Sequence, residues 1–249
     1  MAAHAWTRAA EPWRPVTGTS WEWQISGRVD TSHDVAMYDV DLFDTPLATI
    51  DRLHREGRVV ICYFSAGTLE TFRHDVGALD EAAIGRDLRG WKRERWLDVR
   101  AASVRGLMLA RLDLAVERRC DGVEPDNVDA YENESGFDLT ADDQLAYDRF
   151  LAREAHARGL SVGLKNAVGL ARALEPDFDW ALDEECLVYR ECHALAPFIA
   201  AGKAVFHVEY TRGPPSPDAV RGICTSPAIR GFSTLVKTRE IGPDRASCG

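Results

Sequence analysis

Short apolar runs alternate with longer amphipathic segments along most of the chain. Eight of these runs have the length of strands, and RVVICYFSAG at 58–67 is apolar almost throughout, as expected for a strand buried on both faces. The predicted strands occupy residues 21–26, 34–41, 58–67, 122–127, 160–166, 177–186, 204–210 and 231–237.

Helical patterns separate most of the predicted strands. Residues 47–57 place apolar side chains at 47, 50 and 53 before a glycine, residues 103–120 are helical in pattern, and residues 140–159 begin with Thr140 as N-cap. Eight alternating units in about 250 residues predict the α/β class and a single (β/α)₈ barrel of the TIM type with parallel strands. A doubly wound open sheet is the alternative, but no G-x-G-x-x-G follows any predicted strand, which disfavours dinucleotide binding.

The chain contains no fixed-period repeat, low-complexity segment or obvious linker. We therefore expect one barrel domain at residues 19–249, preceded by a loose arm at residues 1–18. The length of 249 residues suits one large barrel and is ample for a sizeable core.

Charge and hydropathy narrow the classes of partner. The chain is 45% hydrophobic and 28% charged, the balance of a soluble globular protein, and no apolar run is long enough for a membrane-spanning helix. The formal net charge of −10 argues against nucleic acid, whose phosphates attract basic surfaces. The same charge permits a cationic partner, although most acidic proteins are simply soluble.

No C-x-x-C pair occurs among the six cysteines, so a zinc ribbon is not expected. They are Cys62, Cys120, Cys186, Cys192, Cys224 and Cys248. Cys186 and Cys192 are close enough in sequence to bridge a loop in an oxidising compartment, and free buried thiols are the alternative. The first residues lack the basic start and apolar stretch of a signal peptide, so we expect either a cytoplasmic protein or one whose leader has been removed.

Polar, ionisable and aromatic residues end most of the predicted strands. They are Trp23, Gln24, Tyr38, Asp39, Asp41, Tyr63, Ser65, Glu124, Asp126, Asn127, Lys165, Asn166, Asp183, Glu184, Glu185, Glu209 and Tyr210. The active site of a barrel lies at the carboxyl ends of its strands. One such end is an ordinary turn, but seven that converge predict a pocket.

The stretch GVEPDNVDAYENESGF at 122–137 gathers Glu124, Asp126 and Asp129 within six positions. A solvated acidic turn is one interpretation, because Pro, Asp and Asn are common turn residues. Carboxylates that face one cavity from different strands, together with aromatic side chains, favour glycoside hydrolysis. The best pair by position is a carboxylate of the fourth strand and one of the sixth, since those strands stand on different sides of the cavity.

Two other chemistries compete at these strand ends. The acidic stretch DVDLFD at 39–44 offers oxygen ligands of the kind that Mg²⁺ prefers. Lys165 is a candidate for a Schiff base, and an ion pair with a neighbouring carboxylate is the other interpretation. The histidines show no paired metal-ligand spacing, and we expect His207 to pack or hydrogen-bond inside the barrel.

Eight blocks of the sequence resemble, in order, the conserved blocks of glycoside hydrolase family 114, the endo-α-1,4-polygalactosaminidases. The blocks are WEWQISG, VAMYDVDLFDT, GRVVICYFSAGTLETFRHD, RWLDV, CDGVEPDNVDAYENESGFDLT, GLSVGLKN, DEECLVYREC and GKAVFHVEY. The similarity runs from about residue 19 to about residue 237, and many blocks in the right order make it a specific signal.

The resemblance implies a (β/α)₈ barrel that cleaves α-1,4-linked galactosamine polymers, such as galactosaminogalactan, without a cofactor. It places the catalytic pair on Asp126, as nucleophile or electrostatic stabiliser, and on Glu184, as acid and then base. Asp183 stands where the family commonly has Asn, so we expect like-charge repulsion to raise the pKa of Glu184. Glu185 is the alternative to Glu184 as the residue that faces the cavity.

The resemblance also implies a cationic amino-sugar polysaccharide as partner, which agrees with the net charge of −10. We expect substrate contacts from Trp23, Tyr38, Asp39, Asp41, Tyr63, Ser65, Glu124, Asn127, Lys165, Asn166, Glu209 and Tyr210, and no metal. We also expect a monomer that is secreted, since family members are often exported, which fits a removed leader and a Cys186–Cys192 bridge. The competing functions are a barrel that binds the polymer without cutting it and a lyase or aldolase that uses Lys165.

Overall fold

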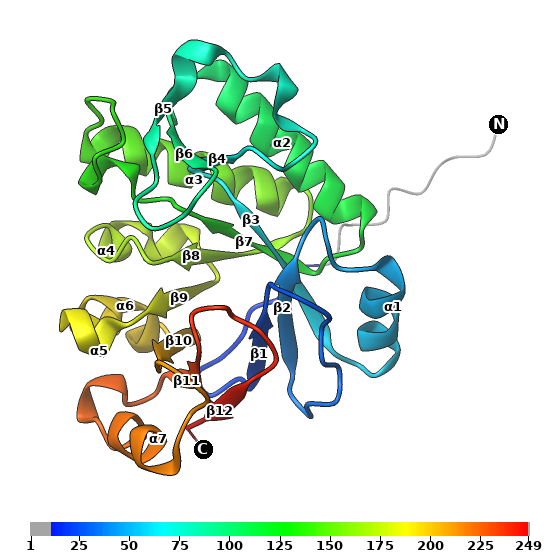
Figure 1. The fold of residues 1–249 in the computed structure, drawn as a ribbon, viewed down its shortest axis with the longest axis vertical. Helices are drawn as coiled ribbons and strands as arrows, with labels where there is room; N and C mark the ends of the chain where they lie inside the picture. Colours follow the sequence, from blue (N-terminus) through cyan, green and yellow to red (C-terminus); the bar gives the residue numbers. More distant parts are fainter. Residues whose placement is uncertain (1–10, 249) are drawn as a thin grey trace.

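The computed structural model describes residues 11–248, and its centre is a sheet whose eight parallel strands curl into a barrel (Figure 1). These strands are β1 (Trp21–Gln24), β2 (Met37–Asp41), β3 (Val59–Ser65), β7 (Gly122–Asp126), β8 (Ser161–Lys165), β9 (Trp180–Glu184), β10 (Val205–Tyr210) and β11 (Ser233–Lys237). All eight predicted strands are present, and the predicted (β/α)₈ barrel is confirmed.

The parallel strands lie in the sheet in chain order, and each pairs with the next. A ninth strand, β12 (Arg245–Ser247), runs antiparallel to β11. Within the described residues no ladder joins β11 to β1, and side chains bridge the two strands instead. Trp21 Nε1 donates to the Ser233 carbonyl at 2.9 Å, and Lys237 Nζ lies 2.6 Å from Glu22 Oε1. All eight carboxyl ends therefore meet at one face, where a barrel carries its site.

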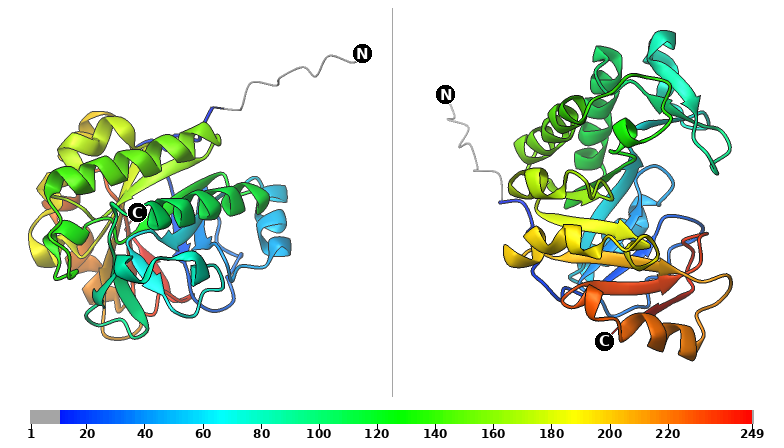
Figure 2. Two further views of the ribbon diagram at one scale, coloured as in Figure 1. Left: turned by 90° about the horizontal axis from the view of Figure 1, so that it is seen from above. Right: turned by 90° about the vertical axis from the view of Figure 1, so that its left-hand side faces the viewer.

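Helices cover the outside of the barrel (Figures 1 and 2). They are α1 (Leu47–Arg55), α2 (Ala102–Glu117), α3 (Ala141–Ala157), α4 (Ala171–Leu174), α5 (Cys186–Tyr189), α6 (Ala196–Ala200) and α7 (Pro217–Cys224). The helices predicted at 47–57, 103–120 and 140–159 are confirmed as α1, α2 and α3. α3 begins with a reciprocal cap, in which Thr140 Oγ1 accepts from the Asp143 amide and the Asp143 carboxylate accepts from the Thr140 amide.

Side-chain alternation along the strands divides the core into two layers. The cluster inside the barrel includes Trp21, Trp23, Met37, Ile61, Trp180, Leu182, Phe206, Val208 and Leu235. Tyr38 and Val40 belong to the larger cluster between the strands and the helices. Gly163 of β8 makes room for the Trp180 ring, because a Cβ at this glycine would lie 2.2 Å from the ring. Wide apolar residues thus fill the barrel at the start and middle of the strands, and the carboxyl ends remain for polar groups.

A small antiparallel sheet follows β3. It consists of β4 (Thr68–Glu70), β5 (Ile84–Asp87) and β6 (Glu94–Leu97), in the order β4-β6-β5, and we call residues 68–97 the insert. Figure 1 shows these strands near α2 and α3, and Figure 2 shows the same region from two further sides. The sequence analysis missed them because each has only three or four residues, too few to show an alternating pattern among many charged positions.

Three disulfides pair all six cysteines: Cys62–Cys120, Cys186–Cys192 and Cys224–Cys248. The bridge considered for Cys186 and Cys192 is therefore present, and the free-thiol alternative is wrong. This bridge closes the loop that follows β9, whereas the other two join segments far apart in the sequence.

Of the arm predicted at residues 1–18, residues 1–10 lie outside the described residues. Val16 forms an antiparallel bridge with Lys203, and the Ala204 amide donates to the Pro15 carbonyl at 3.0 Å. The described part of this segment thus lies against the start of β10. Within residues 11–248, none of the helices has both the length and the apolar character needed to cross a membrane.

Candidate active site

A cavity of about 360 Å³ opens at the carboxyl ends of the barrel strands. Eight of the residues predicted for the site line it: Trp23, Tyr63, Asp126, Asn127, Lys165, Asn166, Glu184 and Tyr210. They lie on or directly after β1, β3, β7, β8, β9 and β10. Strand ends that are far apart in sequence therefore converge on one pocket, as the barrel topology requires.

Lys165 lies at the centre of the polar groups of this cavity. Its ammonium is 2.9 Å from Glu124 Oε1, 3.2 Å from Asp126 Oδ1 and 3.1 Å from Glu184 Oε2, and it also stands over the Trp23 ring. Burial alone would favour the neutral amine, but the three carboxylates outweigh it and raise the pKa of Lys165 well above its ordinary value. The geometry thus supports the ion pair, since a Schiff base requires an uncharged amine.

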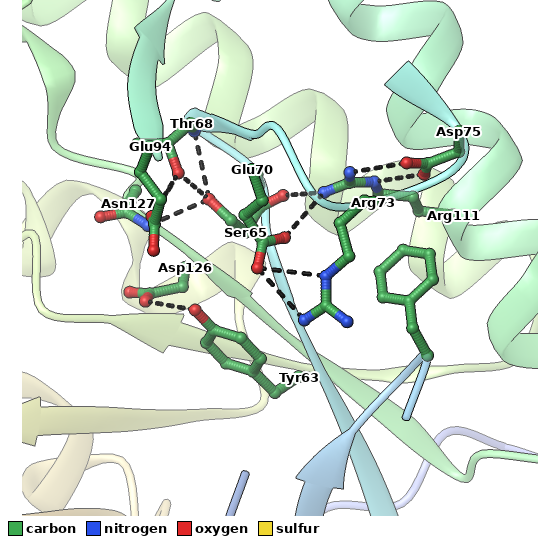
Figure 3. Close-up of polar contacts among 12 residues, drawn as sticks. Tyr63, Ser65, Thr68, Glu70, Arg73, Asp75, Glu94, Arg111, Asp126 and Asn127 are labelled. Atoms are coloured by element: carbon green, nitrogen blue, oxygen red, sulfur yellow. Dashed lines mark hydrogen bonds and ion pairs between the residues drawn. The ribbon is translucent and has the colours of Figure 1, made fainter. Parts of the chain in front are cut away.

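Asp126 ends β7 and is held from the side of β3. The Ala66 amide donates to the Asp126 carbonyl at 2.8 Å, which fixes the backbone. The carboxylate accepts a hydrogen bond from the Tyr63 hydroxyl at 3.1 Å (Figure 3), and it also contacts Lys165. Because this side chain is 17% exposed, its carboxylate is accessible from the cavity while its orientation is fixed.

Glu184 ends β9 and lies on the other side of Lys165. Its amide donates to Asn166 Oδ1 at 3.0 Å, its Oε2 accepts from Asn166 Nδ2 at 3.2 Å, and its Oε1 accepts from the Tyr210 hydroxyl. Burial disfavours ionisation, but the Lys165 ammonium and the hydrogen bonds from Tyr210 and Asn166 hold the pKa of Glu184 below its ordinary value. The expected rise of this pKa is therefore absent from this structure.

Asp183 explains this difference. Its side chain is only 1% exposed, and burial together with the nearby Glu191 and Glu184 raises the pKa of Asp183 to about 8. Asp183 is then neutral at pH 7 and does not repel Glu184. Glu185 also lines the cavity, but its carboxylate pairs with Arg239 at 2.6 Å, so Glu184 is the member of this pair that contacts Lys165.

Glu124 and Asp39 are fully buried and do not form part of the cavity lining. Glu124 Oε2 accepts from Trp23 Nε1 at 2.9 Å, while the other oxygen contacts Lys165. Burial raises the pKa of Glu124, and burial together with the charge of Glu124 raises that of Asp39 well above its ordinary value. Glu124 thus supports Lys165, and both predicted binding residues lie out of reach of a ligand in the cavity.

Four more residues predicted for substrate binding lie away from the lining: Tyr38, Asp41, Ser65 and Glu209. The Tyr38 hydroxyl donates to the His33 carbonyl at 2.7 Å on the outside of β2, because alternation turns it away from the barrel interior. The other three contact residues of the segments that follow β3 and β9. Asp41 pairs with Arg73 at 2.6 Å, Ser65 bonds the Thr68 hydroxyl at 2.6 Å, and Glu209 accepts from the Leu187 amide at 2.9 Å.

Residues that the sequence analysis left out complete the lining. They are Ile25, Leu88, Arg89, Trp91, Glu94, Tyr189, Glu191, Arg239 and Ile241, and Asp129 joins them from the acidic stretch at 122–137. Their positions depend on tertiary contacts of the insert and of the loops after β9 and β11. Of these residues, only Trp91 and Tyr189 could have been suspected from sequence, because each is a large aromatic residue in a charged segment. In the structure their side chains are 55% and 63% exposed, as expected for residues that contact a ligand.

The cavity carries an excess of negative charge. Glu94, Asp126, Asp129, Glu184, Glu185 and Glu191 line it, against the basic residues Arg89, Lys165 and Arg239. Burial raises the pKa of Glu94 to about 7, and burial together with Asp126 raises that of Asp129 to about 6. A cavity with this balance attracts cationic ligands and disfavours anionic ones.

The geometry does not support a Mg²⁺ site at 39–44. Arg73 pairs with both Asp41 and Asp44, whereas Asp39 lies buried against Glu124. Asp41 and Asp44 are thus neutralised by one guanidinium, and Asp39 does not join them around a common ion.

In the described part of the chain, the ligand atoms close enough to share a metal belong to Asp183, Cys186 and His207. The Cys186 sulfur is bonded to Cys192, so it is not available as a thiolate ligand. His207 contacts Thr234 at 3.1 Å and Glu209 at 3.1 Å inside the barrel.

Comparison with known proteins gives one family and a consistent fold. The model of the family described as Glycoside-hydrolase family GH114 matches residues 2–249. The crystal structure of Aspergillus fumigatus Ega3 in complex with galactosamine is similar with a TM-score of 0.92 at 39% sequence identity, over 96% of this chain and 98% of that chain. The glycoside hydrolase domain of PelA from Pseudomonas aeruginosa is similar in fold, with a TM-score of 0.71 at 15% identity over 92% and 98% of the two chains. No curated protein gives a significant match.

Proposed function

Because the chain belongs to glycoside-hydrolase family GH114, we propose that it is an endo-α-1,4-polygalactosaminidase, which cleaves α-1,4-galactosaminidic bonds in a cationic, galactosaminogalactan-like polysaccharide. Family membership gives the reaction class, hydrolysis of a glycosidic bond. The galactosamine bound to Ega3 supports the choice of sugar, since that chain is 39% identical to this one over nearly its whole length.

The observation that carries the proposal is the contact of Asp126 and Glu184 with one ammonium group. Asp126 Oδ1 lies 3.2 Å and Glu184 Oε2 lies 3.1 Å from Lys165 Nζ, so these oxygens are separated by no more than twice the longer distance. The carboxyl groups of retaining glycosidases lie about 5–5.5 Å apart, and those of inverting enzymes about 6.5–9.5 Å apart. Two carboxylates that contact one ammonium are placed to flank one glycosidic bond, and for this pair we propose the retaining mechanism.

In the proposed mechanism Asp126 attacks the anomeric carbon while Glu184 donates a proton to the leaving oxygen. The glycosidic C–O bond breaks, one part of the polymer leaves as an alcohol, and the other is held as an ester of Asp126. Glu184, now a carboxylate, takes a proton from the water that attacks the anomeric carbon and releases Asp126. Bound sugar displaces water from the cavity and adds to the burial of Glu184, which favours its protonated form before the first step.

The charge of the cavity supports a cationic substrate. Acidic residues outnumber basic ones in the lining, and galactosamine carries an ammonium group when it is not acetylated. Two carboxylates and a water account for every step, so the proposed reaction requires no cofactor or metal.

The disulfides support a site of action outside the cell. All six cysteines are paired, and disulfides persist in oxidising compartments such as the extracellular space. We also propose that the active unit is a monomer.

Release of reducing ends from partly deacetylated α-1,4-galactosaminogalactan tests the proposed function. We expect the wild type to release them, and Asp126→Asn and Glu184→Gln each to lower kcat by about 10²–10⁴-fold. Thermal melts of both variants would establish that they are folded. Polymer bound by the wild type without any release of reducing ends would instead indicate a binding protein. Activity that survives either substitution would transfer the role to another carboxylate of the lining, with Glu185 as the first candidate.

A further inference from the structure

The insert turns one carboxyl group into the cavity on the side of Asp126. Glu94, the first residue of β6, is partly buried and lines the cavity together with Trp91. Asp126 and Glu184 share the Lys165 ammonium, whereas Glu94 forms no ion pair with any residue in the range 11–248. Glu94 is thus a cavity carboxyl group whose charge the protein itself leaves without a close counterion.

A chain of hydrogen bonds orients Glu94 relative to Asp126 (Figure 3). Glu94 Oε2 accepts from Thr68 Oγ1 at 3.0 Å, the hydroxyls of Thr68 and Ser65 lie 2.6 Å apart, and Asn127 Nδ2 donates to Ser65 Oγ at 3.0 Å. Because the single Thr68 hydroxyl proton points to Glu94, Ser65 donates to Thr68. Oε1 of Glu94 takes no part in this chain, so the network orients the carboxyl group and leaves one oxygen for a ligand.

Buried ion pairs hold the insert in position. Arg73 lies 3.1 Å from the Glu70 carboxylate, and Arg111 lies 2.8 Å from the carboxylate of Asp75. Arg111 also donates to the Ser65 carbonyl at 2.6 Å, which ties this part of the insert to the end of β3 (Figure 3). Glu94 therefore stands on a fixed wall of the cavity, as a specificity-determining group must.

A partly buried carboxylate without a counterion is costly, and Glu94 shows this cost. Burial raises its pKa to about 7, although the hydrogen bond from Thr68 acts in the opposite direction. A cation placed against Oε1 would offset the cost. The acetamido group of an N-acetylated unit carries no charge and adds bulk against the same wall.

We propose that Glu94 binds the ammonium group of the sugar unit next to Asp126 and thereby selects polysaccharide chains that are deacetylated at this position. The inference rests on the proposed function, because that function supplies the amino sugar. The inference adds to the proposed function the residue that distinguishes an amine from an acetamide, Glu94, and its location on the insert beside the catalytic pair.

Glu94→Gln tests the proposal, because the amide keeps the shape of the side chain and still accepts a hydrogen bond from Thr68. We expect kcat/KM for fully deacetylated galactosamine oligomers to fall by about 10-fold or more, and kcat/KM for oligomers that are N-acetylated at this position to change by less than about twofold. Mass spectrometry of the products should show that the variant loses the preference for a free amine at the corresponding position. Asp87→Asn is the matched control, since it removes one exposed charge from the same insert outside the cavity.

A fall of equal size on both substrates would overturn the proposal, because it would mean that Glu94 only positions Asp126 through Thr68 and Ser65. An unchanged preference would overturn it as well. A second measurement does not depend on turnover: titration of deacetylated oligomer into Glu184→Gln and into the double variant with Glu94→Gln. Weaker binding by about 10-fold in the double variant is expected even if the wild type proves to be a binding protein, so the two proposals can fail separately.

Discussion

The ammonium of Lys165 lies 3.1 Å from the carboxylate of Glu184, and only 1% of the Lys165 side chain is exposed. A buried ammonium at this distance strongly affects the pKa of Glu184. Of the influences that lower the pKa of Glu184 against its burial, Lys165 is the strongest. The lysine thus acts on the ionisation of the proposed acid and need not form a bond to the substrate.

Lys165→Met should move the alkaline limb of the pH profile to higher pH. Without the ammonium the pKa of Glu184 rises, so the proposed acid stays protonated to higher pH, and the limb of kcat/KM that reports it should shift upward by about one unit or more. The activity of the variant at neutral pH should also fall, because Asp126 loses its contact with the Lys165 ammonium. Lys203→Met is the control, since it removes a lysine–glutamate pair outside the cavity lining. An unshifted limb would contradict the role of Lys165.

Activity should decrease with ionic strength. The lining has more acidic than basic residues, and the proposed substrate is a polycation. The Debye length shrinks from about 30 Å at 0.01 M salt to about 3 Å at 1 M, so kcat/KM for a deacetylated chain should fall by about 10-fold or more over this range. Fully N-acetylated polymer provides the comparison in binding assays, because its weak binding should hardly respond to salt. Equal salt sensitivity of the two polymers would argue against steering by charge.

Much of the fold and the centre of the site could be predicted from sequence, because strands buried on both faces leave a visible pattern. Apolar runs located all eight parallel strands, and the barrel rule then placed Asp126, Lys165 and Glu184 at one face. These three residues could be found since each lies at the last position of its strand.

Other features could not be predicted, because they depend on distances and directions that sequence does not contain. Tyr38 lies on a predicted strand but points outward, and only the register decides its direction. Glu94 and Trp91 reach the cavity from an insert whose short strands have no periodic pattern. The direction of the pKa shift of Glu184 required the positions of Lys165, Tyr210 and Asn166, which together outweigh the burial of this carboxyl group.

Trp91→Ala should weaken binding of long substrates. Trp91 lines the cavity and is 55% exposed, so its ring offers a stacking surface for a sugar beyond the catalytic pair. We expect KM for long oligomers to rise by about 10-fold with kcat nearly unchanged, and a smaller effect on the shortest cleaved oligomer. Phe72→Ala is the matched control, because Phe72 is an exposed aromatic residue of the same insert that does not line the cavity. A uniform loss of kcat with all chain lengths would show that Trp91 supports the structure of the insert instead.

Asp183→Asn should stabilise the protein at high pH. In the unfolded chain an aspartate has a pKa of about 3.9, whereas burial and neighbouring carboxylates raise the pKa of Asp183 to about 8 in the fold. Between these two values the unfolded chain is ionised and the folded protein keeps the proton. The unfolded state then binds fewer protons, so the contribution of Asp183 to stability is fully present below about pH 4 and is lost as pH rises toward 8.

The asparagine variant lacks this dependence on pH. We expect its free energy of unfolding to match that of the wild type near pH 4 and to exceed it by about 2 kcal/mol or more near pH 8, as measured by urea denaturation across the range. Asp87→Asn, an exposed position, should leave the pH dependence of the wild type unchanged. Wild type and Asp183→Asn curves that run parallel from pH 4 to pH 8 would mean that Asp183 is ionised in the folded protein. In that case the negative charge of Asp183 would raise the pKa of Glu184. Lys165, Tyr210 and Asn166 would then have to overcome this repulsion, in addition to burial, to keep the pKa of Glu184 low.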